Sequence, residues 1–367
     1  MQGSFSRLYP IQVIYLFAVY LVNAMLLLWL HKQGVSYIGM ILFYMVIYAS
    51  ALASIAALKS IRPRLFFILG IMCNIAVFAI FAFSFRTEYL PLIALLYGPM
   101  FILFWINYNI LFFSSIDSEK KAFGSAVYAF AFSFLATLVP IVSGFTASRY
   151  GMKLIFMAGI AAMIIAMFLA LRIKAPTLHY RIYNSIKCIK GVRLLIFLEG
   201  FWEHLTFVAI PLLALFFIKE EVSMGAYLSY LGLVGAAASL IIAKISDKTK
   251  KRWQFIRILA VSLGIATMFL VFSKNIYLWV AFTGLLYLIS PALKPFQTTV
   301  ALDNIKCSMH DLMVAREFLL NLGRLSGIFL FLISMLPGIK YGSIFVAGIA
   351  MLAYPLVVKM RGYYARR

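Results

Sequence analysis

The chain has little charge and very little acid. Charged residues make up 12% of its 367 positions, and Asp and Glu account for only 11 of them, against 33 Lys and Arg. Water-soluble globular proteins carry about 25% charged residues. A chain that is 65% hydrophobic would expose more apolar surface than water tolerates, which excludes a soluble globule.

Cysteine is also scarce. Cys73, Cys188 and Cys307 are the three cysteines, and they form no CxxC pair. Three residues cannot build a framework of several disulfide bonds, and their spacing excludes a thiolate metal site. We therefore expect no metal and no cofactor.

Nucleotide-binding signatures are missing as well. The sequence has no Walker A motif, no glycine-rich phosphate loop and no soluble domain to hold a nucleotide, which excludes an ATP-driven pump within this chain. The first apolar segment, 11–30, has no small-residue cleavage site near its end. We expect it to stay in the protein as a membrane span and not to act as a cleaved signal peptide.

Long apolar runs dominate what is present, and the mean hydropathy is +1.01. The runs are about 20 residues long, the length of a helix that crosses a bilayer. In lipid only helices and closed barrels satisfy the backbone, and the run length favours helices. We predict an all-α polytopic membrane protein with spans near 11–30, 35–58, 65–83, 90–113, 124–147, 152–171, 194–218, 224–245, 255–273, 276–300, 314–335 and 339–358.

One polar stretch, 172–193, interrupts the apolar chain near its midpoint. It carries six Lys or Arg and no acid. We predict an amino-terminal six-helix bundle over 1–171, a basic linker over 172–193 and a second six-helix bundle over 194–367. Apolar residues at helical spacing, between Pro176 and Gly191, favour an amphipathic helix in the lipid headgroup layer. A flexible, solvated linker fits the composition equally well.

The placement of the bases predicts the orientation. With a cytoplasmic amino terminus, 24 Lys or Arg fall on the inner side and seven on the outer side, as the positive-inside rule requires. Both termini would then be cytoplasmic, in the cytoplasmic (plasma) membrane. Because the bases are spread over short loops between spans, we attribute the net charge of +22 to topology and expect no nucleic-acid partner. The seven outer bases are Lys32, Arg86, Arg149, Lys153, Lys219, Lys274 and Lys340.

Three local patterns point to a known family. The segment that includes Asn107 and Asn109 leads into a polar loop, the next span carries Pro140 and Gly144, and Ala243-Lys-Ile-Ser-Asp247-Lys248 follows the second span of the second half. At these residues the chain resembles the major facilitator superfamily. That family has two six-helix bundles and a GxxxD(R/K)xG(R/K)(R/K) loop. Ala243 and Lys250 stand where the loop prefers glycine, the equivalent first-half loop has no acid, and the GxxxGPxxGG signature is reduced to Pro140 and Gly144.

The loop residues are candidates for a cytoplasmic gate. The Asp247 carboxylate can accept from amides at a helix amino terminus or pair with a base such as Arg316, and so close the cytoplasmic side. A solvated turn rich in bases is the alternative. The gate candidates are Asp247, Lys248, Arg252 and Arg316.

Ionisable residues inside spans are the best functional signal, because burying a charge in a membrane is costly. Glu199 and Glu203 are four residues apart and share a helix face. Lys294 lies between two prolines, which favours a kinked helix near a binding site. The candidates for substrate or ion binding are Glu199, Glu203, His204, Lys294, Gln297, Asn321 and Arg324 in the second half, and the neutral Asn23, Asn107 and Asn109 in the first half.

Two interpretations of these residues stay open. The two acids could neutralise Lys294 and Arg324 as structural ion pairs. Alternatively, one acid, with Glu203 the first choice, binds a coupling proton while Lys294 or Arg324 contacts the substrate. The pattern does not favour a metal site, because no HExxH or HxxEH motif supplies a second histidine.

The resemblance implies a secondary active transporter, not an enzyme. It would move a small-molecule substrate across the lipid bilayer by alternating access, with a proton or another ion as the coupling partner. A transport-inactive membrane scaffold or sensor that keeps the same fold is the alternative.

Overall fold

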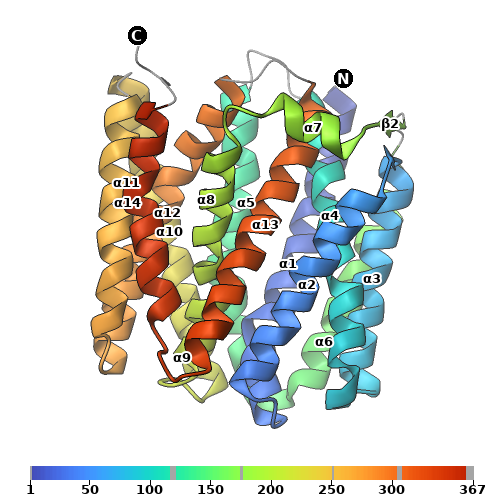
Figure 1. Cartoon of the computed structure of the whole chain (residues 1–367). Coiled ribbons are helices and arrows are strands. Elements are labelled where there is room, and N and C mark those ends of the chain that lie inside the picture. Colours follow the sequence, from blue (N-terminus) through green and yellow to red (C-terminus); the bar gives the residue numbers. More distant parts are fainter. Residues whose placement is uncertain (1, 116–120, 174–176, 250–251, 304–307, 361–367) are drawn as a thin grey trace.

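The computed structural model describes residues 2–115, 121–173, 177–249, 252–303 and 308–360. Twelve helices in this part of the chain are long and apolar enough to cross a membrane, which confirms the predicted class and number of spans. Figure 1 shows them as one upright bundle, with both termini and the linker at the same end. We call this the terminal end and the other the distal end.

The first six spans are single helices, apart from one 3-10 turn at Thr87–Tyr89 that leads into the fourth. Ser36 caps the second helix by accepting from the Gly39 amide at 3.1 Å, and Pro63 begins the third, where its missing N–H costs nothing. The helices are α1 (Gln2–Lys32), α2 (Tyr37–Ala57), α3 (Pro63–Phe83), α4 (Leu90–Ser115), α5 (Lys121–Tyr150) and α6 (Met152–Ala170).

In the second half the first span is divided into α8, a π-helical turn and α9. The last five spans include one 3-10 turn, Leu270–Phe272, and α12 stays a single helix through Pro291 and Pro295. The elements are α8 (Arg193–His204), the π turn (Leu205–Ala209), α9 (Ile210–Ala214), α10 (Glu221–Thr249), α11 (Arg252–Phe269), α12 (Ile276–Asp303), α13 (Met309–Met335) and α14 (Gly342–Met360).

The linker contains a shorter helix than the one that the sequence suggested. Its helix, α7, covers only Ile182–Cys188, because Leu178–His179 forms strand β2, which pairs antiparallel with strand β1 (Ser60–Ile61) of the α2–α3 loop. The Ser185 hydroxyl, on the buried face of α7, donates to the Asp311 carboxylate of α13 at 2.6 Å. The linker is therefore held to α13 on one side and to the α2–α3 loop on the other (Figure 1).

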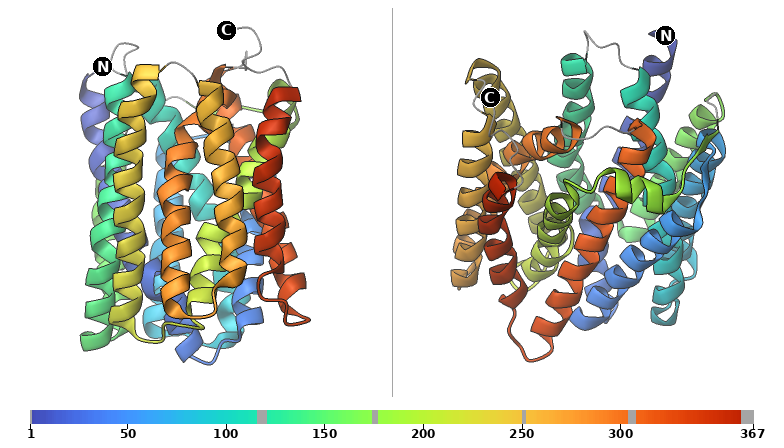
Figure 2. Two further views of the ribbon diagram at one scale, coloured as in Figure 1. Left: turned by 90° about the vertical axis from the view of Figure 1, so that its left-hand side faces the viewer. Right: turned by 45° about the horizontal axis from the view of Figure 1, so that its top comes forward.

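Contacts between the sequence halves are most extensive along two helix pairs, α5 with α10 and α2 with α13, and smaller ones join α4 to α13 and α1 to α10. On the first pair, a Cβ on Gly225 would lie 2.5 Å from the Pro140 carbonyl oxygen, so a side chain there would force the helices apart. Pro140 and Gly144, which the sequence singled out as remnants of a family signature, both lie in this interface. In the side and tilted views of Figure 2, α5 and α10 run close together.

Candidate functional site

Helices α8 and α13 form the framework of the site. Both run from the terminal end towards the distal end, so their residues follow each other in the same order (Figure 1). Glycines let the two backbones touch: a Cβ on Gly323 would lie 2.3 Å from the Phe197 carbonyl oxygen, and one on Gly200 would lie 2.2 Å from that of Leu320. This close approach brings the acids of α8 within reach of the bases of α13.

Glu199 is the acid nearer to the terminal end. Its side chain is buried, and Oε1 accepts from Nη2 of Arg316 on α13 at 2.6 Å. The same oxygen lies 3.5 Å from Nζ of Lys294 on α12. Glu199 therefore interacts with bases on two different helices.

Glu203, one turn further along α8, has an equivalent but stronger set of contacts. Its Oε2 accepts from Nε and Nη2 of Arg324 at 2.9 and 2.5 Å, and its Oε1 accepts from the Lys294 ammonium. Asn321 belongs to the same group, since its Oδ1 accepts from Nη1 of Arg324 at 3.2 Å and its Nδ2 donates to the Glu317 carbonyl at 2.7 Å. Both carboxylate oxygens of Glu203 are thus satisfied by cations.

These five side chains form one charged cluster: Glu199, Glu203, Lys294, Arg316 and Arg324. The sequence pointed to two acids balanced by two bases, but Arg316 adds a third base, so the cluster carries a net charge of +1. Its members are not equally accessible. The Lys294 side chain is 46% exposed, whereas those of Glu199 and Glu203 are 3% and 5% exposed.

The π turn follows directly after the cluster. The Ile210 amide donates to the Leu205 carbonyl, five residues back, and Pro211 has no amide hydrogen for the Phe207 carbonyl. The displaced Thr206 carbonyl instead accepts from the Tyr287 hydroxyl of α12 at 3.4 Å. The local change in helix winding places Phe207 over the Arg324 guanidinium, with 5.1 Å between the guanidinium carbon and the ring centroid.

The first half contributes neutral groups. The ring of Tyr48, on α2, lies 5.9 Å from the Arg324 guanidinium carbon and is a contact between the cluster and this half. Elsewhere hydroxyls pair with amides, as in Tyr97 donating to Asn23 Oδ1 at 2.5 Å and Tyr108 to Gln12 Oε1 at 2.7 Å. Such pairs satisfy buried polar groups without adding charge.

Several predicted site residues lie away from the cluster. His204 is buried on the side of α8 that faces Gly327, and Nδ1 lies against the Phe201 carbonyl. Asn107 is buried and donates to the Leu103 carbonyl of its own helix, while Asn109 is half-buried. Gln297 is buried one turn beyond Lys294, and among the described contacts none joins it to the five charged groups.

The predicted gate included Arg316 as a possible partner of Asp247. In the structure Arg316 lies on α13 and pairs with Glu199 of the charged cluster. The side chains of Asp247, Lys248 and Arg252 lie outside the described part of the structure, although the backbones of these residues belong to α10 and α11.

Tyr48 is a site residue that the sequence analysis did not name, and Arg316 is one that it assigned to the gate and not to the charged cluster. Arg316 lies eight residues before Arg324, about two helical turns, so both share a face of α13. Glu199 and Glu203 lie on α8 in the same order, with the first acid opposite the first arginine and the second acid opposite the second. Because the acids are four residues apart and the arginines eight, this order becomes readable only once α8 and α13 are known to be parallel neighbours. Tyr48 carried no such signal, because many tyrosines occur in these spans.

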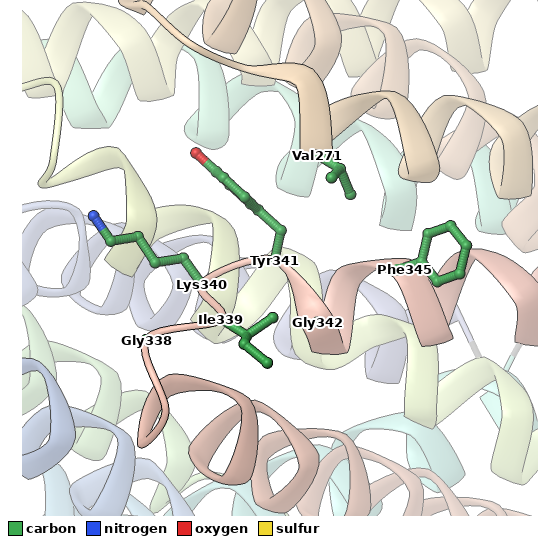
Figure 3. A pocket seen from close by; sticks show the side chains of 7 residues that line it. All are labelled: Val271, Gly338, Ile339, Lys340, Tyr341, Gly342 and Phe345. Carbon is green, nitrogen blue, oxygen red and sulfur yellow. The ribbon is translucent and has the colours of Figure 1, made fainter.

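A separate hollow lies at the distal end and has a different character (Figure 3). It has a volume of about 490 Å³ and is lined by the α13–α14 loop, Val271 and Phe345. Lys340 is its one charged lining residue, and its ammonium lies 4.1 Å from the centroid of the Phe216 ring. No member of the charged cluster lines it. Among the described residues, no group of three His, Cys, Asp or Glu could hold a metal ion.

Solved structures of membrane transporters match the chain over nearly its whole length. A POT family transporter in complex with a thioalcohol-conjugated peptide has a TM-score of 0.76 at 10% identity, covering 99% of this chain and 96% of that one. A POT family transporter in complex with 5-aminolevulinic acid gives 0.74 at 10% identity, covering 97% and 95%. The human organic anion transporter MFSD10 (TETRAN) gives 0.70 at 14% identity, covering 97% and 99%.

No family model and no curated protein matches the sequence. The structural matches show the fold alone: the chain folds like these transporters over nearly its whole length, and its twelve candidate spans make it a multi-pass membrane protein.

Proposed function

We propose that this transporter-fold protein is a secondary carrier that moves a small solute across the membrane by alternating access, coupled to protons. The observation that carries the proposal is the charged cluster on α8, α12 and α13. Charges inside a membrane protein are costly, and they commonly mark substrate and ion pathways. A scaffold with no transport role has no need of five ionised groups, one of them 46% exposed, among its spans.

The moving units that we propose are the two six-helix bundles, 1–171 and 194–367, with 172–193 as the linker between them. Their rocking would expose the cluster to one side of the membrane at a time. We assign both termini to the cytoplasm and the protein to the plasma membrane, because 24 of the bases then lie inside and seven outside. The work of the protein in this proposal is translocation, with no covalent chemistry.

Glu203 is the residue that we assign to proton coupling. Its carboxylate is shared by Arg324 and Lys294, on two different helices, so a change in the distance between α12 and α13 alters its stabilisation. A carboxylate that loses cationic partners in a buried site takes up a proton, and it releases the proton when they return. The other charged groups around it are Glu199 and Arg316, with Glu317 as a half-buried acid on α13.

The test is solute uptake by proteoliposomes that contain the purified full chain, measured across a panel of small solutes with and without an inward proton gradient. Liposomes without protein give the background uptake of each solute. The proposal predicts accumulation of at least one solute above its external concentration only when the gradient is imposed. A panel without flux in any condition would favour the alternative of a transport-inactive scaffold or sensor.

A further inference from the structure

Lys294 is the surplus base of the charged cluster. Each buried acid already has its own arginine, Glu199 with Arg316 at 2.6 Å and Glu203 with Arg324 at 2.5 Å. Without Lys294 these would remain two neutral ion pairs. The ammonium lies between the two acids, and it is the group that gives the cluster its net positive charge.

The excess charge is also the accessible charge. The side chains of Arg316 and Arg324 are 13% and 14% exposed, and the acids are less exposed still, whereas that of Lys294 is 46% exposed. An ammonium has three N–H donors, and the two carboxylate oxygens within 4 Å occupy at most two of them. A solute that reaches the cluster therefore contacts the Lys294 ammonium, which has an N–H donor available. The two carboxylates are less exposed than this ammonium.

The charges around the cluster leave Lys294 as its most exposed group. Helices α1–α6 contain no acidic residue, and the first half approaches the cluster with the ring of Tyr48. Glu317, next to Arg316, is half-buried and close enough for its charge to act on Lys294, but among the described residues it forms no ion pair with a base of the cluster. Phe207, 49% exposed beside Arg324, adds an aromatic surface. A site built for a cation would place the acids, not the lysine, on the accessible side.

We propose that the transported solute is an organic anion, with its carboxylate bound by Lys294 and its carbon skeleton beside Phe207. This inference rests on the proposed transport function and names the substrate class of the same site. Lys294 binds as a point charge, so several anionic groups would fit, and a carboxylate is the simplest probe.

The experiment measures thermal stabilisation of the detergent-purified full chain by matched compounds. Two skeletons, hexanoic acid and 4-phenylbutyric acid, are each used as the carboxylate, the uncharged amide and the corresponding amine. Stabilisation by mass action reports binding without requiring transport. We expect at least one carboxylate to raise the melting temperature, and its amide and amine to have no comparable effect.

Two variants test the assignment. Lys294→Gln keeps both arginine–glutamate pairs and should weaken carboxylate binding about tenfold or more, as expected for loss of a charge-assisted contact. Lys274→Gln removes an exposed base in the α11–α12 loop and should bind as wild type does. Lys294→Arg, which keeps the charge, should retain part of the binding.

Each outcome decides the proposal. No stabilisation by either carboxylate, stabilisation by the amines instead, or unchanged binding in Lys294→Gln would overturn it. Carboxylate binding without flux in proteoliposomes would keep the anion site and reject the transport function. Flux of neutral or cationic solutes, with no carboxylate binding, would keep transport and reject the anion.

Discussion

Glu203 and Arg324 form a two-point ion pair between α8 and α13, in which one carboxylate oxygen accepts from Nε at 2.9 Å and from Nη2 at 2.5 Å. Such a fork geometry fixes orientation as well as distance. Because Lys294 binds the other oxygen, Glu203 links α8 to both α12 and α13. The first prediction follows from this double link.

Glu203→Gln should abolish proton-driven accumulation and spare solute exchange at equal pH. A glutamine keeps the side-chain size but cannot load a proton, so the accumulation ratio should fall to about 1 under an imposed gradient, as expected when the coupling free energy is lost. Proteoliposome uptake at two internal pH values measures both properties. Glu88→Gln is the matched control, since it neutralises an exposed acid in the 3-10 turn before α4, away from the cluster. A Glu203→Gln protein that still concentrates solute would transfer the role to Glu199.

Arg324→Gln should destabilise the protein far more than Lys294→Gln does. Without Arg324, Glu203 keeps only a half-exposed lysine, and breaking a buried pair costs about 3 kcal/mol or more. Lys294→Gln leaves each acid with its arginine and should cost less than about 1 kcal/mol. Thermal unfolding in detergent should show this order.

The double variant Glu203→Gln/Arg324→Gln provides the check on that explanation. It removes both charges together, so it should recover most of the stability lost in Arg324→Gln alone. Equal stability of the single and double variants would mean that Arg324 acts through packing on Tyr48 and Phe207, not through the ion pair.

Gly323→Ala should separate α8 from α13. The new methyl group would lie 2.3 Å from the Phe197 carbonyl oxygen, and overpacking of this kind costs about 1–3 kcal/mol. We expect a lower melting temperature and weaker proton coupling, because the acids on α8 and the bases on α13 move apart. Ser326→Ala, at a half-buried position on the same helix, should change neither property. Wild-type behaviour of Gly323→Ala would show that the helix contact tolerates adjustment.

Phe216→Ala should open the distal end more than Glu221→Gln does. The exposed pair Lys32–Glu221, at 2.5 Å, joins the two halves but contributes only about 0–1 kcal/mol in water. Phe216 stacks on Tyr37 of the other half, with 4.5 Å between the ring centroids. The Lys340 ammonium lies over the same Phe216 ring. Labelling of a Phe207→Cys reporter, at an exposed position of the π turn on the distal side of the cluster, measures opening from that side. A larger effect of Glu221→Gln would make the ion pair the main distal contact.

Single-cysteine labelling should place position 187 on the cytoplasmic side and position 86 outside. The reason is the excess of bases on the loops at the terminal end. A membrane-impermeant thiol reagent added to intact cells should label Arg86→Cys. It should modify Lys187→Cys only after the cells are permeabilised. The reverse pattern would invert the proposed orientation.

The sequence by itself determined that the protein lies in lipid, that its spans are helices, and which charged residues lie within them. Apolar runs long enough to cross a bilayer can only be helices there, because lipid leaves no other partner for the backbone, so all twelve spans were predictable. The same cost of burial singled out Glu199, Glu203, Lys294 and Arg324, which the structure places in one cluster.

Only the tertiary structure decided how those charges pair. The sequence offered Asp247 as a partner for Arg316, but the glycine contact between the parallel helices α8 and α13 brings Arg316 to Glu199. His204, next to Glu203 in sequence, turns to Gly327 because neighbouring helix positions point about 100° apart. Pairing depends on which helices are adjacent and how closely they approach. Periodicity within one segment does not contain that information. The packing of α8 on α13 pairs each acid with an arginine, and this leaves Lys294 as the accessible, surplus cation.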